Sequence, residues 1–525
     1  MGVKRNAQPD GTALPMTNSN KENTPLEIAD ILVIGGGING AGIARDAAGR
    51  GLDVVLCEKD DLAQHTSSSS TKLIHGGLRY LEYFDFPLVR HALREREVLL
   101  KSAPHIIWPL RFLLPHHKAL RPRWMIRLGL FLYDHIGGRR LLPASWGVDL
   151  RKHVGGEALK PEFTRGFEYS DCWVQDARLV VLNARDAHNR GARIWTHTKC
   201  TALDRESDHW MVTLTNSRNG KETRLRARAV VNAAGPWVEH TLHLDVSVDT
   251  DSGVRLVKGS HIVVPSLFDH PYPYIFQNED NRVLFAIPYE GDFTLLGTTE
   301  VEIEGGPDDV SIDDSEITYI CNAINRYMKT PVKASDIVWS YTGVRPLFDD
   351  HAKNASKVTR DYVLQLNDDG PPILSVFGGK ITTYRKLSEQ AVDILKAPLG
   401  FAQSGWTTGT TLPGGDIESG DFDKFLTRCK QTYAWLDDAV LNDYARNYGS
   451  EIDRLLDGCS SIGDLGIDFG GGLFECEVAY LMKYEWAETA EDILWRRTKK
   501  GLRVPEGTDI RLQAWMDGHT NHANR

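Results

Sequence analysis

A glycine-rich turn near the start of the chain constrains its fold more than any other feature. Gly35, Gly37 and Gly40 follow the spacing Gly-x-Gly-x-x-Gly, directly after the apolar run 30–34. Glycines let such a turn close and let the backbone approach a pyrophosphate, whose charge the N-terminus of the next helix stabilises. The alternative is a glycine-rich turn without a ligand. The context of strand and turn favours a nucleotide-binding unit.

The residues after the turn supply the other parts of this motif. Residues 41–50 have the pattern of a helix, and residues 54–56 that of a second strand. Glu58 closes this strand 18 residues after Gly40, where an acidic side chain accepts hydrogen bonds from ribose hydroxyls. The motif by itself fits FAD and NAD alike. Its position at the start of a long chain that is rich in further strands favours FAD.

The size and charge of the chain limit the classes of function. A chain of 525 residues is long for a single core, so at least one further domain is expected. The net charge of -10 argues against a nucleic acid partner, because phosphate backbones are bound by Lys and Arg. The seven cysteines are scattered without a Cys-x-x-Cys pair, so neither a metal site nor a disulfide framework is predicted. No stretch is apolar and long enough to span a bilayer.

Changes of pattern along the chain indicate three parts. Residues 1–27 have no apolar run and are predicted to be a disordered extension, a transit peptide being the poorer alternative. Residues 28–405 carry the nucleotide-binding motif and are rich in strand-like runs. These runs are residues 193–195, 210–214, 229–233, 261–264, 283–287 and 373–377. From about Thr407 the segments are charged and helical without strand alternation, so residues 406–525 are predicted to form a helical domain.

Seven segments of the chain resemble the FAD-dependent glycerol-3-phosphate dehydrogenases. Residues 34–51 and 378–388 resemble the two signature sequences of that family. The other segments are residues 71–82, 166–173, 258–264, 343–347 and 492–499. Ser388 stands where the family pattern has alanine; both residues are small. The resemblance covers roughly residues 28–510 and leaves out the polar N-terminal extension.

The resemblance implies a fold class, a reaction and partners. The fold is α/β, with a Rossmann-type FAD-binding domain, a substrate domain on a mixed or antiparallel sheet, and an α-helical C-terminal domain. The reaction is oxidation of sn-glycerol 3-phosphate to dihydroxyacetone phosphate, with electrons passed to ubiquinone or menaquinone. A homodimer bound to the anionic inner face of the plasma membrane, in the cytoplasm, is also implied. The alternatives are an oxidase that uses oxygen and a flavin-bearing protein without turnover.

The chemistry of alcohol oxidation directs attention to a base and to cations. His261 is the first candidate for the base that takes the hydroxyl proton, because a histidine titrates near neutrality. A phosphate dianion needs several cations, and the resemblance points to Arg79, Arg345, Arg360 and Lys380, with Tyr80 adding a hydroxyl. Taken singly, each of these residues is more often a surface or core residue.

Further residues are expected to hold the cofactor. Gly378, Gly379 and Lys380 lie between a strand and a helix that begins near Thr382, where backbone donors and a lysine stabilise a reduced flavin anion. The polar run after the first motif adds Thr66, Ser67, Ser68 and Lys72. Ala234 and Gly235 end a strand where such folds bring the backbone close to the nucleotide. The alternative for residues 378–380 is a glycine turn with a solvated lysine, and the alternative for the polar run 66–72 is a flexible linker.

Residues 105–140 combine apolar and aromatic side chains with seven cations and a single acid, Asp134. This pattern suits insertion into the headgroup region of an anionic membrane, where a quinone is reached without a spanning helix. The alternative is a buried helix pair whose basic residues face solvent or substrate. With the resemblance to a membrane-bound family, the segment is predicted to be the membrane contact.

Overall fold

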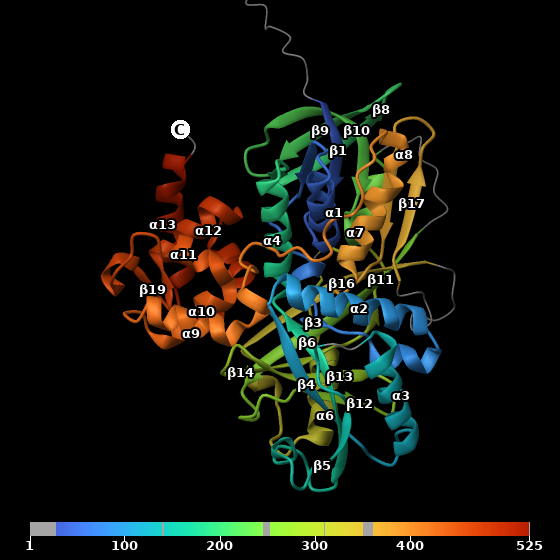
Figure 1. The fold of residues 1–525 in the computed structure, drawn as a ribbon, viewed down its shortest axis with the longest axis vertical. Coiled ribbons are helices and arrows are strands. Elements are labelled where there is room, and N and C mark those ends of the chain that lie inside the picture. The colour runs from blue at the N-terminus through green and yellow to red at the C-terminus, as the bar shows by residue number, and fades with distance from the viewer. Residues whose placement is uncertain (1–27, 139–140, 245–252, 309, 350–360, 524–525) are drawn as a thin grey trace, which may run out of the picture.

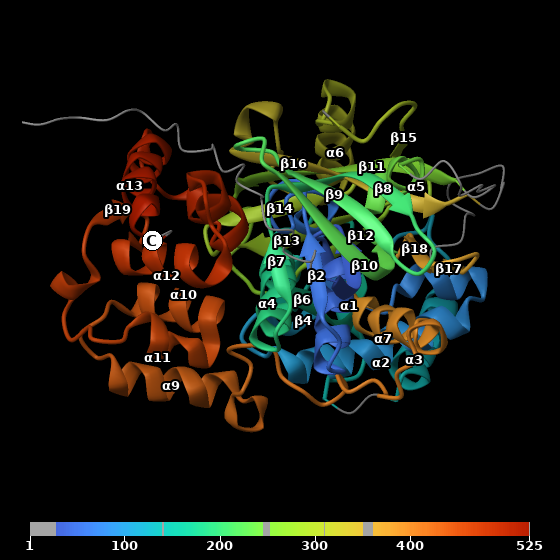
Figure 2. The same cartoon turned by 90° about the horizontal axis from the view of Figure 1, so that it is seen from above.

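The computed structural model describes residues 28–138, 141–244, 253–308, 310–349 and 361–523. Two large sheets follow one another along the long axis of the molecule, and a helical lobe stands to one side (Figures 1 and 2). This arrangement confirms the predicted α/β fold class. Arg360, predicted to bind the substrate phosphate, and residues 1–27, predicted to be disordered, lie outside the described residues.

The first sheet contains the predicted strand–helix–strand motif. Its strands run in the order β17-β18-β10-β1-β2-β7, and β1 pairs in parallel with β2 and β10. Parallel strands are buried on both faces, which explains why the run 31–34 is almost uninterruptedly apolar. The strands are β1 (Ile28–Ile34), β2 (Val54–Cys57), β7 (Arg193–Trp195), β8 (Thr198–Arg205), β9 (Trp210–Asn216), β10 (Glu222–Asn232), β17 (Val363–Asn367) and β18 (Ile373–Phe377).

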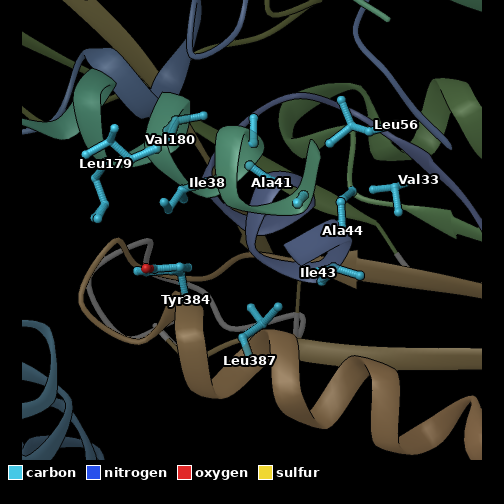
Figure 3. Close-up of a cluster of buried hydrophobic side chains, with 14 of the residues drawn as sticks. Val33, Ile38, Ala41, Ile43, Ala44, Leu56, Leu179, Val180, Tyr384 and Leu387 are labelled. Atoms are coloured by element: carbon cyan, nitrogen blue, oxygen red, sulfur yellow. The ribbon is translucent and has the colours of Figure 1, made fainter. Parts of the chain in front are cut away.

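Three helices pack together on one face of this sheet. They are α1 (Ile38–Gly49), α4 (Asp176–Asn189) and α7 (Tyr384–Ile394). Figure 3 shows side chains of α1 between those of α4 and α7. A Cβ on Gly42 of α1 would lie 2.5 Å from Ser388 Oγ, so small residues allow the close approach of α1 and α7. Ser388 is buried and donates to the Tyr384 carbonyl at 2.8 Å, which satisfies its hydroxyl.

The second sheet is mostly antiparallel and lies beyond the carboxyl ends of the first. Its main order is β15-β11-β14-β13-β12-β4-β6-β3, with β16 beside β11 and β5 beside β6. The strands are β3 (Leu73–Ile74), β4 (Ile107–Pro115), β5 (Trp146–Asp149), β6 (Arg165–Val174), β11 (Val254–Pro265), β12 (Tyr274–Gln277), β13 (Val283–Tyr289), β14 (Phe293–Gly297), β15 (Val301–Glu302) and β16 (Trp339–Phe348). Five further helices precede the C-terminal part in the described sequence: α2 (Phe86–Ser102), α3 (Arg123–Ile136), α5 (Val238–Leu242), α6 (Asp314–Tyr327) and α8 (Lys396–Leu399).

The segment 105–140 divides between two environments, which corrects the membrane prediction in part. β4 pairs with β6 and β12 inside the second sheet, and Phe112, Leu113 and Leu114 on it are buried. This half of the segment is neither a membrane contact nor part of a helix pair. Helix α3 is the other half, and apolar side chains on it are exposed. Strand pairing over long sequence distances decided this outcome, because β6 lies some 60 residues after β4.

The C-terminal part has its own hydrophobic core. Its buried apolar residues run from Ile417 to Met516 and form one cluster. The helices are α9 (Phe422–Thr432), α10 (Asp438–Tyr448), α11 (Ile452–Leu455), α12 (Glu475–Glu485) and α13 (Thr508–Ala523). A short hairpin of β19 (Asp468–Gly470) and β20 (Leu473–Phe474) was not predicted. Buried ion pairs join this lobe to the rest, among them Arg178 with Glu485 and Asp61 with Arg497.

Candidate active site

A cavity of about 1050 Å³ is lined by both sheets. The first sheet contributes residues that follow the carboxyl ends of β1, β2 and β10, which is where parallel sheets bind ligands. The second sheet contributes Phe112, Tyr169 and Phe285, and the turn before α7 contributes Gly378 to Thr382. Of the predicted site residues, the cavity is lined by Gly35, Gly37, Glu58, Thr66, Ser67, Arg79, Tyr80, Ala234, Gly235, Arg345, Gly378, Gly379, Lys380 and Thr382.

The glycine-rich turn forms one end of the cavity. Gly35 has a φ of +111°, and a Cβ on it would lie 2.5 Å from the Ala233 carbonyl oxygen. Gly37 caps α1, and Ser67 Oγ accepts a hydrogen bond from the Ile38 amide at 3.0 Å. Gly40 does not line the cavity. A Cβ on Gly40 would lie 1.9 Å from the Gly35 carbonyl oxygen, so this glycine allows the turn to pack on the helix.

Glu58 directly follows β2 and lines the cavity, and its contact with a ribose stays a prediction. Its Oε2 accepts from the Gly36 amide at 2.6 Å and its Oε1 from the Asp60 amide at 2.9 Å. Burial raises the pKa of Glu58, and the two amides oppose this rise because they stabilise the carboxylate. The carboxyl group is therefore held in one position at the cavity wall, where each oxygen keeps a further acceptor site.

Two residues of the polar run 66–72 do not line the cavity, contrary to expectation. Lys72 Nζ donates to Asp176 Oδ1 at 2.8 Å in a buried ion pair. Ser68 donates to the His65 carbonyl oxygen at 3.3 Å. A buried ammonium is costly without an acidic partner, so the side chain of Lys72 follows Asp176 on α4 away from the cavity. Thr66 does line it and donates to the Val344 carbonyl oxygen at 2.7 Å.

Cations from three distant segments line the same cavity. Lys380 Nζ lies 3.9 Å from the centre of the Tyr80 ring. Arg345 donates to Thr298 Oγ1 at 3.3 Å, and its guanidinium lies so close to Gly259 that a Cβ there would be 2.7 Å away. Arg79 lies beside Tyr80 in the cavity wall. The second sheet and the turn before α7 thus bring together side chains that are separated by up to 301 residues, from Arg79 to Lys380.

The turn before α7 has a conformation that favours glycine. Gly378 and Gly379 have φ values of +71° and +105°. The Asn39 amide group donates to the Gly378 carbonyl oxygen at 3.1 Å, which ties this turn to the start of α1. A Cβ on Gly379 would lie 2.9 Å from Asn39 Nδ2. The turn is thereby held next to the glycine-rich turn, with Lys380 at the cavity.

His261, the predicted base, lies behind the cavity wall. Its ring is 1% exposed, is stacked on Tyr341, and does not line the cavity. Nε2 is 2.9 Å from Thr71 Oγ1, and Nδ1 is buried with no hydrogen-bond partner among the described residues. Burial lowers the pKa of His261 well below its usual value, and the charges of Arg345 and Lys72 add to this effect. Thr71 stands between this histidine and the cavity.

His75 and Asp171 are among the cavity residues that sequence reasoning missed. Each lies inside a segment that carried the family resemblance, but no chemical argument singled it out. Asp171 accepts hydrogen bonds from Arg96 at 2.7 Å and from the Tyr133 hydroxyl at 2.8 Å. Its pKa is raised to about 6 by burial, against the opposing effect of Arg96. A histidine beside a motif glycine was the one signal available in the sequence.

These residues fit FAD. The glycine-rich turn lines the cavity through Gly35, which has a positive φ, and through Gly37, where a Cβ would meet only Ser67 Oγ, so a ligand can approach the backbone at the start of α1 as a pyrophosphate does. Ser67, Glu58 and the start of α1 would hold the dinucleotide. Gly379, Lys380 and Thr382 would lie at the flavin, where a cation and backbone donors stabilise the charge of the reduced ring.

Comparisons with known proteins agree with this site. Residues 30–385 match the family model "FAD dependent oxidoreductase", and residues 406–513 match the "C-terminal domain of alpha-glycerophosphate oxidase". The chain is 51% identical to the D-erythritol 1-phosphate dehydrogenase of Brucella abortus, over 94% of this chain and 98% of that protein. It is 50% identical to the glycerol-3-phosphate dehydrogenase of Pseudomonas aeruginosa, over 97% of this chain and 99% of that protein.

A solved structure has the same fold. The glycerol-3-phosphate dehydrogenase from Bacillus halodurans complexed with FAD matches with a TM-score of 0.73 and 26% identity, over 93% of this chain and 94% of that chain. This protein is therefore an FAD-dependent oxidoreductase, and it belongs to the family of the FAD-dependent glycerol-3-phosphate dehydrogenases.

Proposed function

We propose that the protein oxidises sn-glycerol 3-phosphate to dihydroxyacetone phosphate and passes the electrons to a membrane quinone. The observation that carries this proposal is that Arg79, Arg345 and Lys380 line the same cavity as the dinucleotide turn. A phosphate dianion needs such a cluster, and Arg offers it paired donors. FAD, when bound, supplies the hydride acceptor. The names of the relatives support the choice of substrate.

Each cation has a distinct part in this proposal. Arg345 is placed by Gly259 and Thr298 and binds the phosphate or the reacting oxygen. Arg79 and Tyr80 come from the short 3₁₀ helix Leu78–Tyr83 and supply a further cation and a hydroxyl. Lys380 stabilises negative charge at the flavin end of the substrate. Aromatic residues of the second sheet, such as Phe112 and Phe285, exclude water from the reacting carbon.

D-Erythritol 1-phosphate is a second candidate substrate, because a relative at 51% identity is named for it. It offers the same phosphate and an adjacent secondary alcohol on a longer polyol. The cavity is also lined by Gln277 and Arg282, polar residues that suit additional hydroxyl groups.

Anaerobic titration of the purified FAD-loaded protein with each polyol phosphate tests these candidates. Loss of flavin absorbance at low micromolar to millimolar glycerol 3-phosphate is expected, and preferential bleaching by D-erythritol 1-phosphate would transfer the assignment to that substrate. Turnover with a ubiquinone analogue is expected to exceed turnover with oxygen. Stoichiometric hydrogen peroxide without quinone reduction would instead make the protein an oxidase.

We also propose that helix α3 brings the protein to the inner face of the plasma membrane. Trp124, Leu128, Phe131 and Leu132 lie at helical spacing on one face and are exposed, Trp124 by 66%. Arg123 is exposed beside them, and the 3₁₀ helix Leu78–Tyr83, which lines the cavity, packs against α3. Such a face suits insertion at the headgroup boundary. Among the described residues no helix has the length and apolar character to cross a bilayer.

Co-sedimentation with vesicles that contain anionic lipid tests this contact. The double variant Trp124→Ser, Phe131→Ser is expected to lose most of its vesicle binding at high salt. A triple variant is expected to lose most of its binding at low salt, where charge attraction dominates; its changes to Glu are at Arg121, Arg123 and Arg127. The matched control is Ile462→Ser, Ile510→Ser, which removes exposed apolar side chains from the C-terminal domain. Equal binding of all variants would rule out α3. We also propose that the protein is a homodimer, as the family resemblance implies, and sedimentation velocity of the vesicle-free protein tests this.

A further inference from the structure

Arg345 is held at the cavity by two neighbours, and each belongs to a short segment whose own support lies behind the cavity wall. Gly259 lies against the guanidinium, so that a Cβ on it would be 2.7 Å from Nη2. Thr298 Oγ1 accepts a hydrogen bond from the same Nη2 at 3.3 Å. All three residues line the cavity. The position of this cation therefore depends on what fixes residues 258–260 and 298–299.

Thr299 ties these two segments together, after the end of β14 and before the start of β15. Its amide donates to the Ser260 carbonyl oxygen at 3.4 Å, and its Oγ1 accepts from the Ser260 amide at 2.9 Å. The Thr298 hydroxyl donates to the Thr299 carbonyl oxygen at 3.2 Å, which leaves the lone pairs of Thr298 Oγ1 for Arg345. Thr299 thus continues the pairing with β11 across the break between two strands.

The carboxylate of Glu316, behind the wall, receives donors from both segments. Its Oε1 accepts from Thr299 Oγ1 at 2.5 Å and from Ser260 Oγ at 3.0 Å. Its Oε2 lies 2.9 Å from Lys258 Nζ and accepts from the Asp313 amide at 3.2 Å. Glu316 is 3% exposed and does not line the cavity. Each oxygen has two partners, so the buried charge is compensated.

A role in capping helix α6 explains only part of these contacts. Asp313 and Glu316 form a capping box at the start of α6, to which the contact between Oε2 and the Asp313 amide belongs. The contacts of Oε1 instead reach β11 and the segment after β14, which are 56 and 17 residues away in sequence. A cap does not require these two contacts, so they point to a role in the cavity wall.

We propose that Glu316 is a positioning residue for Arg345, which it holds in the geometry that binds the substrate phosphate. This inference rests on the proposed function. Glu316 fixes the residues on either side of Gly259 and the residue that follows Thr298. The two contacts of Arg345 are thereby ordered before the substrate arrives. A preorganised cation binds an anion more tightly than one that must be ordered during binding.

The experiment measures the binding of dihydroxyacetone phosphate to oxidised, FAD-loaded protein, read from the flavin spectrum. Glu316→Gln keeps the size of the side chain but removes the charge that holds Lys258. The dissociation constant of dihydroxyacetone phosphate is expected to rise by about 10- to 100-fold, because a small displacement of a binding group has effects of this size. The dissociation constant of dihydroxyacetone, which has no phosphate, is expected to stay within about 2-fold of wild type. FAD content and the unfolding midpoint identify a variant that fails to fold.

A second pair of variants tests the same contacts from the sheet. Thr299→Val removes the hydroxyl and keeps the shape of the side chain, so it is expected to weaken phosphate binding as Glu316→Gln does. Thr299→Ser keeps the hydroxyl and is expected to bind dihydroxyacetone phosphate within about 2-fold of wild type. Asp421→Ala is the control for loss of a cap, because Asp421 accepts from the Lys424 amide at 3.1 Å at the start of α9. It should lower the unfolding midpoint and leave the dissociation constant unchanged.

A double-mutant cycle separates positioning from a general loss of stability. In the Arg345→Ala background there is no guanidinium to displace, so Glu316→Gln is expected to change the dissociation constant by less than about 2-fold. Additive losses overturn the inference, as does a Glu316→Gln protein that binds dihydroxyacetone phosphate as tightly as wild type. A wild-type protein whose flavin spectrum responds neither to dihydroxyacetone phosphate nor to any polyol phosphate contradicts the proposed function itself.

Discussion

Arg497 donates to both carboxylate oxygens of Asp61, each at 2.7 Å, and neither side chain has solvent exposure. Asp61 follows Glu58 by three residues at the cofactor end of the cavity, whereas Arg497 belongs to the C-terminal domain. Arg496 adds a further hydrogen bond to Asp61 at 2.6 Å. The C-terminal domain is thus anchored beside the nucleotide-binding motif, through charges that have no contact with water.

Asp61→Asn is expected to destabilise the protein by about 3–5 kcal/mol, because it leaves two buried guanidinium groups without their shared carboxylate. The unfolding midpoint and the FAD content should fall together. The matched control is Asp53→Asn, which breaks the exposed pair with Arg193 at 2.9 Å and should cost under about 1 kcal/mol. Similar midpoints for the two variants would show that the domain contact is not held by this pair.

Gly37→Val is expected to fold and to lose FAD. A Cβ at this position would meet only Ser67 Oγ at 3.1 Å, so the protein tolerates it, but the side chain would occupy the space of the pyrophosphate. Gly40→Val is the contrasting variant and should fail to fold, since its Cβ would lie 1.9 Å from a carbonyl oxygen. Flavin absorbance and circular dichroism separate the two outcomes. Normal flavin content in folded Gly37→Val would contradict the assignment of this turn.

Arg345→Ala is expected to weaken phosphate substrates more than glycerol, with a loss of about 2–4 kcal/mol in kcat/KM for glycerol 3-phosphate. Gly259→Ala tests the same group indirectly, because its Cβ would displace the Arg345 guanidinium without removing the charge. It should raise KM for glycerol 3-phosphate and leave FAD bound. Equal losses for glycerol and glycerol 3-phosphate would reject a phosphate role for Arg345.

His105 is expected to make the protein sensitive to acid. Its ring is fully buried beside the C-terminal domain, with no hydrogen-bond partner for either nitrogen among the described residues. Burial lowers its pKa to about 3, and Arg178 and Arg446 add to this effect. The unfolded chain therefore takes up the proton first as pH falls below 6.5. Stability is complete above that pH and declines by about 1.4 kcal/mol per unit down to about pH 3.

The measurement is the unfolding midpoint of wild type and of His105→Leu at pH 7.5 and at pH 5.0. Wild type should lose more stability than the variant between these values, by about 2 kcal/mol at 1.4 kcal/mol per unit. Leu at position 105 alters packing equally at both pH values. The effect of His105 protonation is therefore read from the change with pH in the stability difference between the two proteins. Parallel declines for the two proteins would assign the acid sensitivity to other groups.

Local sequence determined the nucleotide-binding motif and most strands of the first sheet. Gly35, Gly37, Gly40 and Glu58 lie within 24 residues, and their chemistry follows from spacing along one strand, turn and helix. The strand-like run 193–195 coincides with β7, and the run 373–377 with β18. An apolar run bounded by turn residues predicts a strand from neighbouring residues alone, without knowledge of the strand with which it pairs. The C-terminal helical domain was predicted from another local signal, charged segments without strand alternation.

Tertiary structure decided which chemically suitable side chains face the cavity. His261 reaches Thr71 across 190 residues, and Lys72 reaches Asp176 across 104, and both contacts turn predicted site residues away from the ligand. His75 faces the cavity because Tyr133 and Thr382 hold its backbone, a relationship that spans 307 residues. Burial and charge pairing depend on neighbours that are distant in sequence, so local spacing supplied the residue types and the fold selected among them.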